Sequence, residues 1–174
     1  MDAKIRAAIR EVPDFPKPGI LFFDITTLLQ DPQQFARTCD KFVDHYIGED
    51  FDRILAIDAR GFLFGAVMAY RLNKSLVVVR KKGKLPYKTN SVQYQLEYGV
   101  DEIHMNIDAV QPGERVVVVD DLLATGGTAK AACNLVEQSG GSVHSCAFVI
   151  EIEGLGGRDR LAPVPVFALL ELSE

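Results

Sequence analysis

Two adjacent carboxylates and a glycine-rich turn follow a hydrophobic run in the second half of the sequence. Residues 115–132 read RVVVVDDLLATGGTAKAA, so Asp120 and Asp121 come directly after four valines. Gly126 and Gly127 allow the backbone to approach an anion closely, and a helix that begins there would supply free N–H donors. Two carboxylates would repel a phosphate placed on them, but they suit hydroxyl groups or a metal ion nearby. A ribose 5-phosphate combines these groups, and we predict a site for such a ligand.

This segment differs from two other phosphate-binding motifs. It has no Lys after the glycines, as a P-loop has, and it lacks the G-x-G-x-x-G spacing of dinucleotide-binding turns. A buried strand followed by Asp and a glycine-rich turn also occurs as an ordinary helix cap, so the two glycines alone are weak evidence. The whole string of strand, Asp-Asp and Thr-Gly-Gly-Thr is much rarer and favours the ribose phosphate site.

Two further polar stretches follow predicted strands and would reach the same edge of a sheet. Asp58, Ala59 and Arg60 come after an apolar run at residues 53–57, and a basic run at residues 80–88 follows another apolar run. An Arg in such a turn can hold a phosphate group, and a basic run in an acidic chain can hold a diphosphate. Local pairing of Arg60 and a solvated basic face are the simpler alternatives.

Short apolar runs alternate with helical patterns along most of the chain. Such runs predict strands buried on both faces, and apolar residues at helical spacing predict amphipathic helices. The predicted strands are 20–25, 53–57, 76–79, 116–119, 143–150 and 164–170. The predicted helices are 2–10, 32–47, 62–72 and 129–137, with Asp31 as the N-cap of the second. The sequence therefore predicts an α/β fold in a single domain, residues 1–174, with an open, mostly parallel sheet and helices on both faces.

Two segments depart from this alternation. Residues 1–30 contain three prolines before the strand 20–25, which is either an edge strand or an apolar wall for a flat base. Residues 87–107 alternate apolar and polar side chains around a glycine, which predicts a hairpin. A hairpin inserted between strand and helix repeats suits an active-site lid, so we expect a flap there.

The composition narrows the class of protein. The 174 residues are 48% hydrophobic and 25% charged, as in a globular domain with a substantial core. The net charge of −5 argues against a nucleic-acid-binding surface, and no stretch predicts a membrane span or a signal peptide. We therefore expect a cytoplasmic protein without nucleic-acid or membrane partners. Cys39, Cys133 and Cys146 lack metal-ligand spacing and are expected to be buried free thiols.

Six strings along nearly the whole chain resemble the adenine phosphoribosyltransferases, within the purine/pyrimidine phosphoribosyltransferase family. They are FPKPGILFFDIT, ARGFLFG, RKKGKLP, LEYG, VVVVDDLLATGGT and LAPVPV. The resemblance implies transfer of a phosphoribosyl group from phosphoribosyl diphosphate to adenine, which gives AMP and diphosphate in purine salvage. It also implies a homodimer and a Mg²⁺ cofactor, bound through substrate and water, with Asp120 and Asp121 as the nearest carboxylates.

The resemblance also assigns roles position by position. The 5′-phosphate would be held by Ala124, Thr125, Gly126, Gly127 and Thr128, and the ribose hydroxyls by Asp120 and Asp121. The diphosphate would be held by Asp58, Ala59, Arg60, Lys81 and Lys84. In similar enzymes the loop that corresponds to residues 58–60 contains a non-proline cis peptide. Some of the lysines reach across a dimer interface in those enzymes. The adenine would lie against Leu21, Phe22 and Phe23 in an N-terminal hood, residues 1–30. Glu97 and Tyr98 would lie on the catalytic flap, residues 87–107.

The implied catalytic residues are Glu97, Asp120, Asp121 and Arg60. Glu97 is the expected handler of the adenine N9 proton, with a water or a diphosphate oxygen as alternatives. One position departs from the family pattern L-F-R-D, because Phe23 replaces the Arg; it can stack on a base but cannot donate a hydrogen bond. Two other functions remain as alternatives: the same transfer to another purine, and a non-catalytic regulator that binds phosphoribosyl diphosphate.

Overall fold

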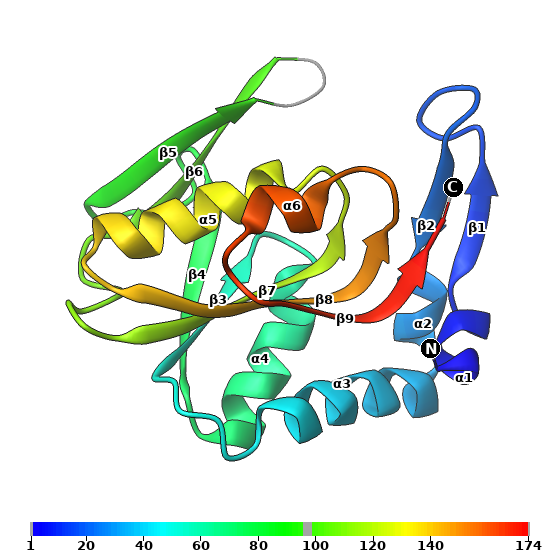
Figure 1. Ribbon diagram of the computed structural model, residues 1–174, viewed down its shortest axis with the longest axis horizontal. Coiled ribbons are helices and arrows are strands. Elements are labelled where there is room, and N and C mark those ends of the chain that lie inside the picture. Colours follow the sequence, from blue (N-terminus) through cyan, green and yellow to red (C-terminus); the bar gives the residue numbers. More distant parts are fainter. Residues whose placement is uncertain (1, 96–98, 174) are drawn as a thin grey trace.

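A seven-stranded sheet forms the centre of the protein (Figure 1). The computed structural model describes residues 2–95 and 99–173. The strands of the sheet, in chain order, are β3 (Arg53–Ile57), β4 (Ser75–Lys81), β5 (Thr89–Gln95), β6 (Val100–Asn106), β7 (Arg115–Leu123), β8 (Ser142–Ile152) and β9 (Val166–Leu172). Their order across the sheet is β5–β6–β4–β3–β7–β8–β9. Five neighbouring strands, β4, β3, β7, β8 and β9, are parallel to one another. Their carboxyl ends therefore meet at one edge of the sheet, where ligands bind in open α/β sheets.

Helices cover both faces of this sheet. In Figure 1, α3 (Pro32–Tyr46) and α4 (Gly61–Leu72) lie on one face, and α5 (Gly127–Gln138) and α6 (Gly157–Leu161) lie on the other. The helix α4 connects β3 to β4, and α5 connects β7 to β8. The mostly parallel α/β fold that the sequence predicts is therefore confirmed. None of the described helices is long and apolar enough to cross a membrane.

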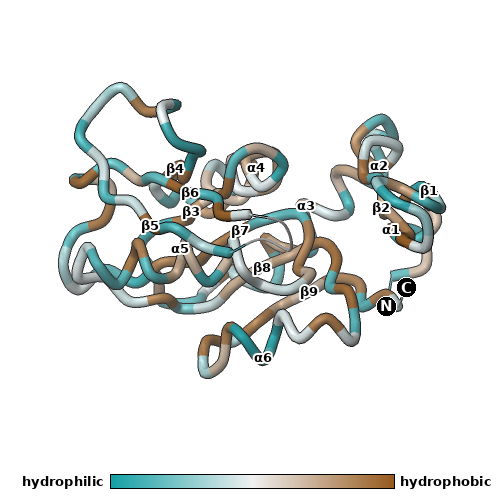
Figure 2. The backbone as a smooth tube through the Cα atoms, turned by 90° about the horizontal axis from the view of Figure 1, so that it is seen from above, coloured by the Kyte–Doolittle hydropathy of each residue, from teal (hydrophilic) through white to brown (hydrophobic). Residues whose placement is uncertain are grey.

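The four valines of β7 contribute to two hydrophobic clusters, one on each face of the sheet. Val116 and Val118 belong to the apolar cluster on the α5 face, whereas Val117 and Val119 belong to the cluster on the α3 and α4 face, and all four are fully buried. Successive side chains of a strand point to opposite faces, so a central strand must be apolar throughout. Figure 2 shows hydrophobic stretches along these central strands. All three cysteines are buried free thiols, as expected.

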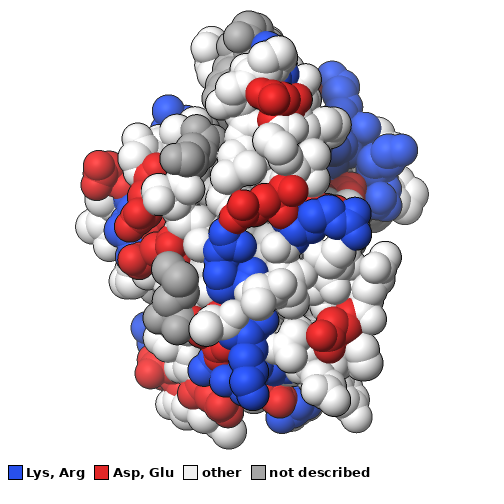
Figure 3. Space-filling view, turned by 90° about the vertical axis from the view of Figure 1, so that its right-hand side faces the viewer, with Lys and Arg blue, Asp and Glu red and all other residues white. Residues whose placement is uncertain are grey.

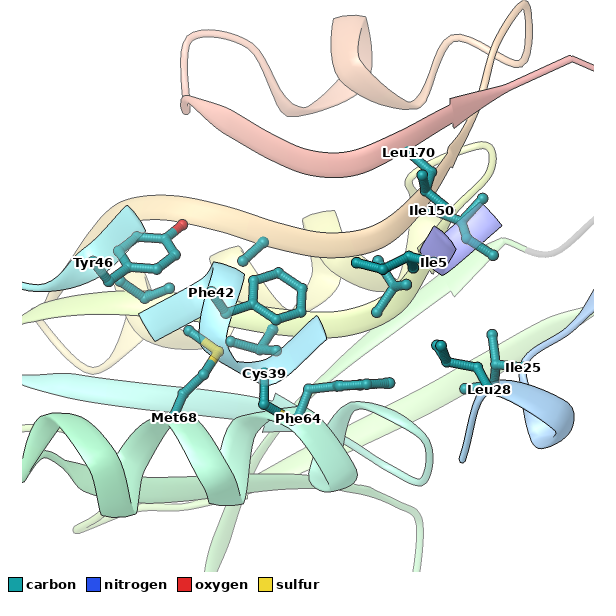
Figure 4. Packing of buried hydrophobic residues seen from close by; sticks show 14 of the residues in the cluster. Ile5, Ile25, Leu28, Cys39, Phe42, Tyr46, Phe64, Met68, Ile150 and Leu170 are labelled. Atoms are coloured by element: carbon teal, nitrogen blue, oxygen red, sulfur yellow. The ribbon is translucent and has the colours of Figure 1, made fainter. Parts of the chain in front are cut away.

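The core between α3, α4 and the sheet fixes the position of both helices (Figure 4). Phe42 of α3 and Phe64 of α4 are fully buried, with ring centroids 6.1 Å apart. The helix α3 begins after Asp31, whose Oδ1 accepts hydrogen bonds from the N–H groups of Gln33 and Gln34, which confirms the expected N-cap. This packing holds α4 against the sheet, and the first residue of α4 lies at the candidate site.

The first 30 residues form a small unit beside the main sheet. It consists of α1 (Ala3–Ala7), β1 (Arg10–Pro13), β2 (Leu21–Asp24) and α2 (Thr26–Gln30). The strands β1 and β2 pair antiparallel in a two-stranded sheet of their own, which confirms the strand expected at 20–25. The first helix is shorter than the predicted 2–10, because the chain from Arg10 onward pairs with β2. Figures 1 and 2 both place this unit near β9.

The hairpin of β5 and β6 extends the main sheet. Its alternating pattern correctly predicts two strands, and β6 continues the sheet by pairing antiparallel with the end of β4. Arg80 lies opposite His104, and Lys81 lies opposite Ile103. The local pattern of the hairpin did not predict this pairing, because it depends on a strand far from it in sequence. Glu97 and Tyr98 lie outside the described residues.

Candidate active site

The turn from β7 into α5 forms a cavity at the carboxyl edge of the sheet. Gly126, just before α5, has a φ of 76°, in the left-handed region that favours glycine, and no side chain caps the helix. The first N–H groups of α5 are therefore free to bind an anion. The cavity has a volume of about 230 Å³. It is lined by Arg60, Asp120, Asp121 and residues 122–129.

A close contact with α6 holds this turn in place. A Cβ atom on Gly126 would lie 2.9 Å from the carbonyl oxygen of Gly157, and a Cβ atom on Gly157 would overlap the carbonyl oxygen of Ala124. The turn and α6 can approach so closely only because both positions are glycine. Gly157 was not predicted as a site residue, because the glycine-containing stretch around it indicates only a loop or a short helix.

Asp120 and Asp121 lie side by side in this cavity. Oδ1 of Asp120 accepts a hydrogen bond from the N–H of Asp121, with N and O 2.9 Å apart. Burial, together with the neighbouring Asp121 carboxylate, raises the pKa of Asp120 well above its ordinary value. The buried Oδ2 of Asp121 has no hydrogen-bond partner among the described residues, although Nε of Arg60 lies 2.8 Å away outside hydrogen-bond geometry. The Arg60 guanidinium balances the charge of this oxygen, which can still accept a hydrogen bond from a ligand.

The turn from β3 into α4 brings Arg60 to the same cavity. Gly61, the first residue of α4, packs directly on β7, where a Cβ atom would lie only 2.6 Å from the carbonyl oxygen of Val119. This contact places the preceding Arg60 beside Asp121. The structure therefore joins two stretches, 58–61 and 120–128, that the sequence predicts to share one edge of the sheet.

The rest of this turn is fixed by β4. The peptide bond between Asp58 and Ala59 is cis, as the resemblance implies. The N–H of Asp58 donates to the carbonyl oxygen of Val79 at 2.9 Å, and its carboxylate accepts a hydrogen bond from Nε of Arg80 at 3.0 Å. In the sequence, Arg80 is identifiable only as part of a basic run. The structure shows that it tethers Asp58, a role that is visible only once β3 and β4 are paired.

The two lysines expected at the diphosphate lie outside the cavity. Nζ of Lys81 pairs with the carboxylate of Asp101 on β6 and lies 3.4 Å from the hydroxyl of Tyr94. Lys84 is exposed in the loop after β4. Of the cationic residues expected at the diphosphate, only Arg60 lines the cavity.

The expected adenine-binding residues lie on β2 and divide between two environments. The ring of Phe22 is partly exposed and packs edge-to-face on Phe15, and the guanidinium carbon of Arg60 lies 5.9 Å from its centroid. Phe23 is only 3% exposed and packs in the core, with Arg6 over its ring. Alternation along the strand explains this division. Figure 3 shows this side of the molecule, where cationic and anionic side chains are interspersed.

Comparison with known proteins identifies the family. A family model described as the phosphoribosyl transferase domain matches residues 26–163. An adenine phosphoribosyltransferase from Acidobacterium capsulatum is 54% identical over 170 residues, which cover 98% of this chain and 94% of that protein. The crystal structure of adenine phosphoribosyltransferase from Thermoanaerobacter pseudethanolicus is 49% identical, with a TM-score of 0.94 over 97% of this chain and 98% of that one.

A more distant structure has the same fold. It is the adenine phosphoribosyl transferase from Trypanosoma brucei, solved in complex with AMP, pyrophosphate and ribose-5-phosphate. It is 26% identical, with a TM-score of 0.90 over 97% of this chain and 78% of that one. The chain belongs to the phosphoribosyl transferase family and, within it, to the adenine phosphoribosyltransferases.

Proposed function

We propose that the cavity at the start of α5 binds the ribose 5-phosphate part of phosphoribosyl diphosphate, which this chain transfers to adenine. The free N–H groups of residues 126–128 would hold the 5′-phosphate, with the hydroxyls of Thr125 and Thr128 as further donors. Asp120 and Asp121 would accept hydrogen bonds from the ribose hydroxyls. One observation carries this proposal: a buried carboxylate oxygen without a hydrogen-bond partner lies beside an uncapped helix N-terminus.

The chemistry follows from charge. The bond between the first ribose carbon and diphosphate breaks, adenine N9 bonds to that carbon, and the N9 proton leaves, which yields AMP and diphosphate. The ribosyl carbon becomes more positive as diphosphate departs, and the Asp120 and Asp121 carboxylates would stabilise this charge. Arg60, with Asp58 and Ala59 of the same turn, would hold the leaving diphosphate. The N9 proton would pass to Glu97, with a water or a diphosphate oxygen as the alternative acceptor.

The carboxylate pair also fits the Mg²⁺ that the family implies. Magnesium prefers oxygen ligands, keeps several waters, and is usually held by one or two carboxylates together with substrate phosphates. Asp121 offers one buried oxygen without a hydrogen-bond partner, and the described residues contain no larger cluster of metal-binding side chains. Asp120 and Asp121 would thus hold the ion through its water or directly. When bound, it would neutralise charge on the departing diphosphate.

The base would enter between β2 and the cavity. Leu21 would present its backbone to the adenine edge, and Phe22 would supply a ring for stacking, since it faces Arg60. Phe23 lies in the core in this structure, so its contribution would be to shape β2 from behind. We propose that residues 1–30 act as the base-binding hood and residues 87–107, with Glu97 and Tyr98, as the flap of one domain.

An exposed apolar surface on α4 and β4 supports the proposed homodimer. Leu63, Tyr70 and Leu76 are 40%, 85% and 41% exposed, which is unusual for side chains of this size on neighbouring elements. We propose that in this dimer Lys81 and Lys84 reach the site of the partner subunit, as the family resemblance implies. We propose that the enzyme works in the cytoplasm, in purine salvage.

One assay tests the proposed function. The purified protein, with phosphoribosyl diphosphate and Mg²⁺, is given adenine, hypoxanthine, guanine or xanthine, and nucleotide formation is followed. We expect AMP formation with a clear preference for adenine. Preference for another purine would contradict the assignment of the base. Binding of phosphoribosyl diphosphate without nucleotide formation from any base would instead favour a regulator.

A further inference from the structure

A second cavity also borders Gly127 and lies between α5 and the strand β5. It has a volume of about 270 Å³ and is bordered by residues 92–95 of β5, by Gly127, Lys130, Ala131 and Asn134 of α5, and by Arg160 of α6. Gly127, Lys130 and Asn134 fall on one face of α5, since they are three or four residues apart. In Figure 1 this region lies at the far side of the sheet from β1 and β2.

Among the described residues, the two cations in this cavity have no anionic partner. Neither Lys130 nor Arg160 makes an ion pair or a side-chain hydrogen bond with any residue in the described ranges. Arg158, two residues away on the same helix, shows the contrast, because its guanidinium pairs with both Glu151 and Glu171. The described residues that line the second cavity include no Asp or Glu, so its side-chain charge is positive.

The remaining lining supplies hydrogen-bond donors. The side-chain amide of Asn134 carries an N–H₂ group. The strand β5 is the edge strand of the sheet, so its outer edge has backbone N–H groups that no neighbouring strand pairs. Two unpaired cations and several neutral donors around a small cavity match the charge and the acceptor oxygens of a phosphoryl group.

We propose that this second cavity binds a phosphoryl anion, either free phosphate or the phosphate group of a small phosphomonoester. It is separate from the 5′-phosphate site, because the two cavities share only Gly127 of their linings. Nη1 of Arg160 would lie 3.3 Å from a Cβ atom placed on Gly127, so the guanidinium packs against the first turn of α5. An anion bound here would link β5 to α5 and α6.

Hydrogen–deuterium exchange can locate this binding in the intact protein. The protein is first saturated with AMP, which fills the 5′-phosphate site under the proposed function and should protect residues 124–128. Inorganic phosphate or glycerol phosphate is then added, with chloride at equal ionic strength as the control. We expect saturable slowing of exchange in residues 92–95 and 130–134. Response to only one of the two anions identifies which source of the phosphoryl group the cavity accepts.

Three variants decide the proposal. Arg160→Gln and Lys130→Gln should each raise the half-saturating phosphate concentration roughly tenfold, the usual effect of losing one charge-assisted hydrogen bond. Lys4→Gln, which removes a cation from α1, should leave it unchanged. Equal responses in all three variants, or protection confined to residues 124–128, would overturn the second site. Absence of protection at 124–128 by AMP alone would instead contradict the proposed function and leave the phosphate response of 92–95 as a separate result.

Discussion

The two turns that form the candidate site have the same strand-to-helix architecture but differ in the contacts that their polar groups make. The β3–α4 turn and the β7–α5 turn each follow a buried strand, and each leads into a helix that no side chain caps. The first is tied down, because Asp58 pairs with Arg80 and Gly61 touches β7. The second is left open, with free N–H groups and a carboxylate oxygen that lacks a hydrogen-bond partner. The β3–α4 turn, called the rigid turn below, therefore supports Arg60. The β7–α5 turn, called the open turn, presents the polar groups that can bind a ligand.

The largest expected effect concerns the open turn. Replacing Asp120 and Asp121 together with Asn should lower turnover by roughly 10²–10³, as the loss of preorganised charge at a reacting centre does. Asn has nearly the same shape, so the fold should persist. Initial rates of AMP formation and a thermal melt measure the two properties. Near wild-type rates in a folded double variant would remove these residues from the proposed catalytic machinery.

Alanine substitution of the glycine that begins each helix, Gly61 of α4 and Gly127 of α5, tests how tightly each turn is packed. Gly61→Ala places a Cβ atom 2.6 Å from the carbonyl oxygen of Val119, so α4 must shift from β7. We expect it to destabilise the fold by about 1–3 kcal/mol, as overpacking does, and to impair activity by moving Arg60. Urea denaturation at fixed pH measures the stability.

Gly127→Ala is the matched control. The nearest atom to its added Cβ would be Nη1 of Arg160, at 3.3 Å, and a long side chain can move away. Alanine also favours helix over glycine by up to about 1 kcal/mol, so the stability should be equal or higher. Equal losses in the two variants would show that the first residue of α5 is packed as tightly as the first residue of α4.

The open turn was predictable from the sequence because its signal is local. Four valines, two carboxylates and two glycines lie within 12 residues, and strand periodicity alone places them at the carboxyl edge of a sheet. The strands, the helix after Asp31 and the hairpin were predictable for the same reason. The family strings add the base and the reaction, which no local pattern contains.

The rigid turn was predictable only in part, because its supports come from other elements. Arg80 reaches Asp58 only when β3 and β4 are adjacent, and Gly61 meets Val119 only when α4 packs against β7. Burial of Phe23 likewise depends on the register of β1 and β2, which the family pattern L-F-R-D does not contain. These contacts join residues far apart in sequence, so single-sequence patterns do not reveal them.

A smaller effect on activity is expected from breaking the ion pair between Arg80 and Asp58. Arg80→Gln removes a partly exposed ion pair, which contributes at most about 1 kcal/mol to stability. Its main expected result is a several-fold higher KM for phosphoribosyl diphosphate, because the turn that presents Arg60 loses its support. The control is Arg71→Gln, which breaks a more exposed pair with Asp40 on the outside of α4. An unchanged KM in Arg80→Gln would assign the rigidity of this turn to Gly61 alone.

The smallest effect concerns the pH dependence of stability. The pKa of Asp120 is raised in the folded state by burial and by Asp121, so ionisation of this carboxyl disfavours folding. Its contribution to stability is fully present below the unfolded pKa of about 4 and is lost as pH rises through the raised folded pKa. Asp120→Asn cannot ionise. We therefore expect this variant to melt at a higher temperature than the wild type at pH 7 and to lose that advantage in acid.

Glu114→Gln should show the opposite behaviour. The guanidinium of Arg53 lowers the pKa of Glu114, so this carboxylate stabilises the fold above its unfolded pKa, and that contribution disappears as pH falls through the lowered folded pKa. The variant should melt below the wild type at pH 7, with the gap closing in acid. Thermal melts of both variants between pH 3 and pH 8 make the comparison. The buried Asp120 carboxylate of the ligand site lowers the stability of the free protein, whereas the ion pair between Glu114 and Arg53 raises it. If Asp120→Asn instead lowered the melting temperature at pH 7, the open turn would be a structural element like its tied counterpart.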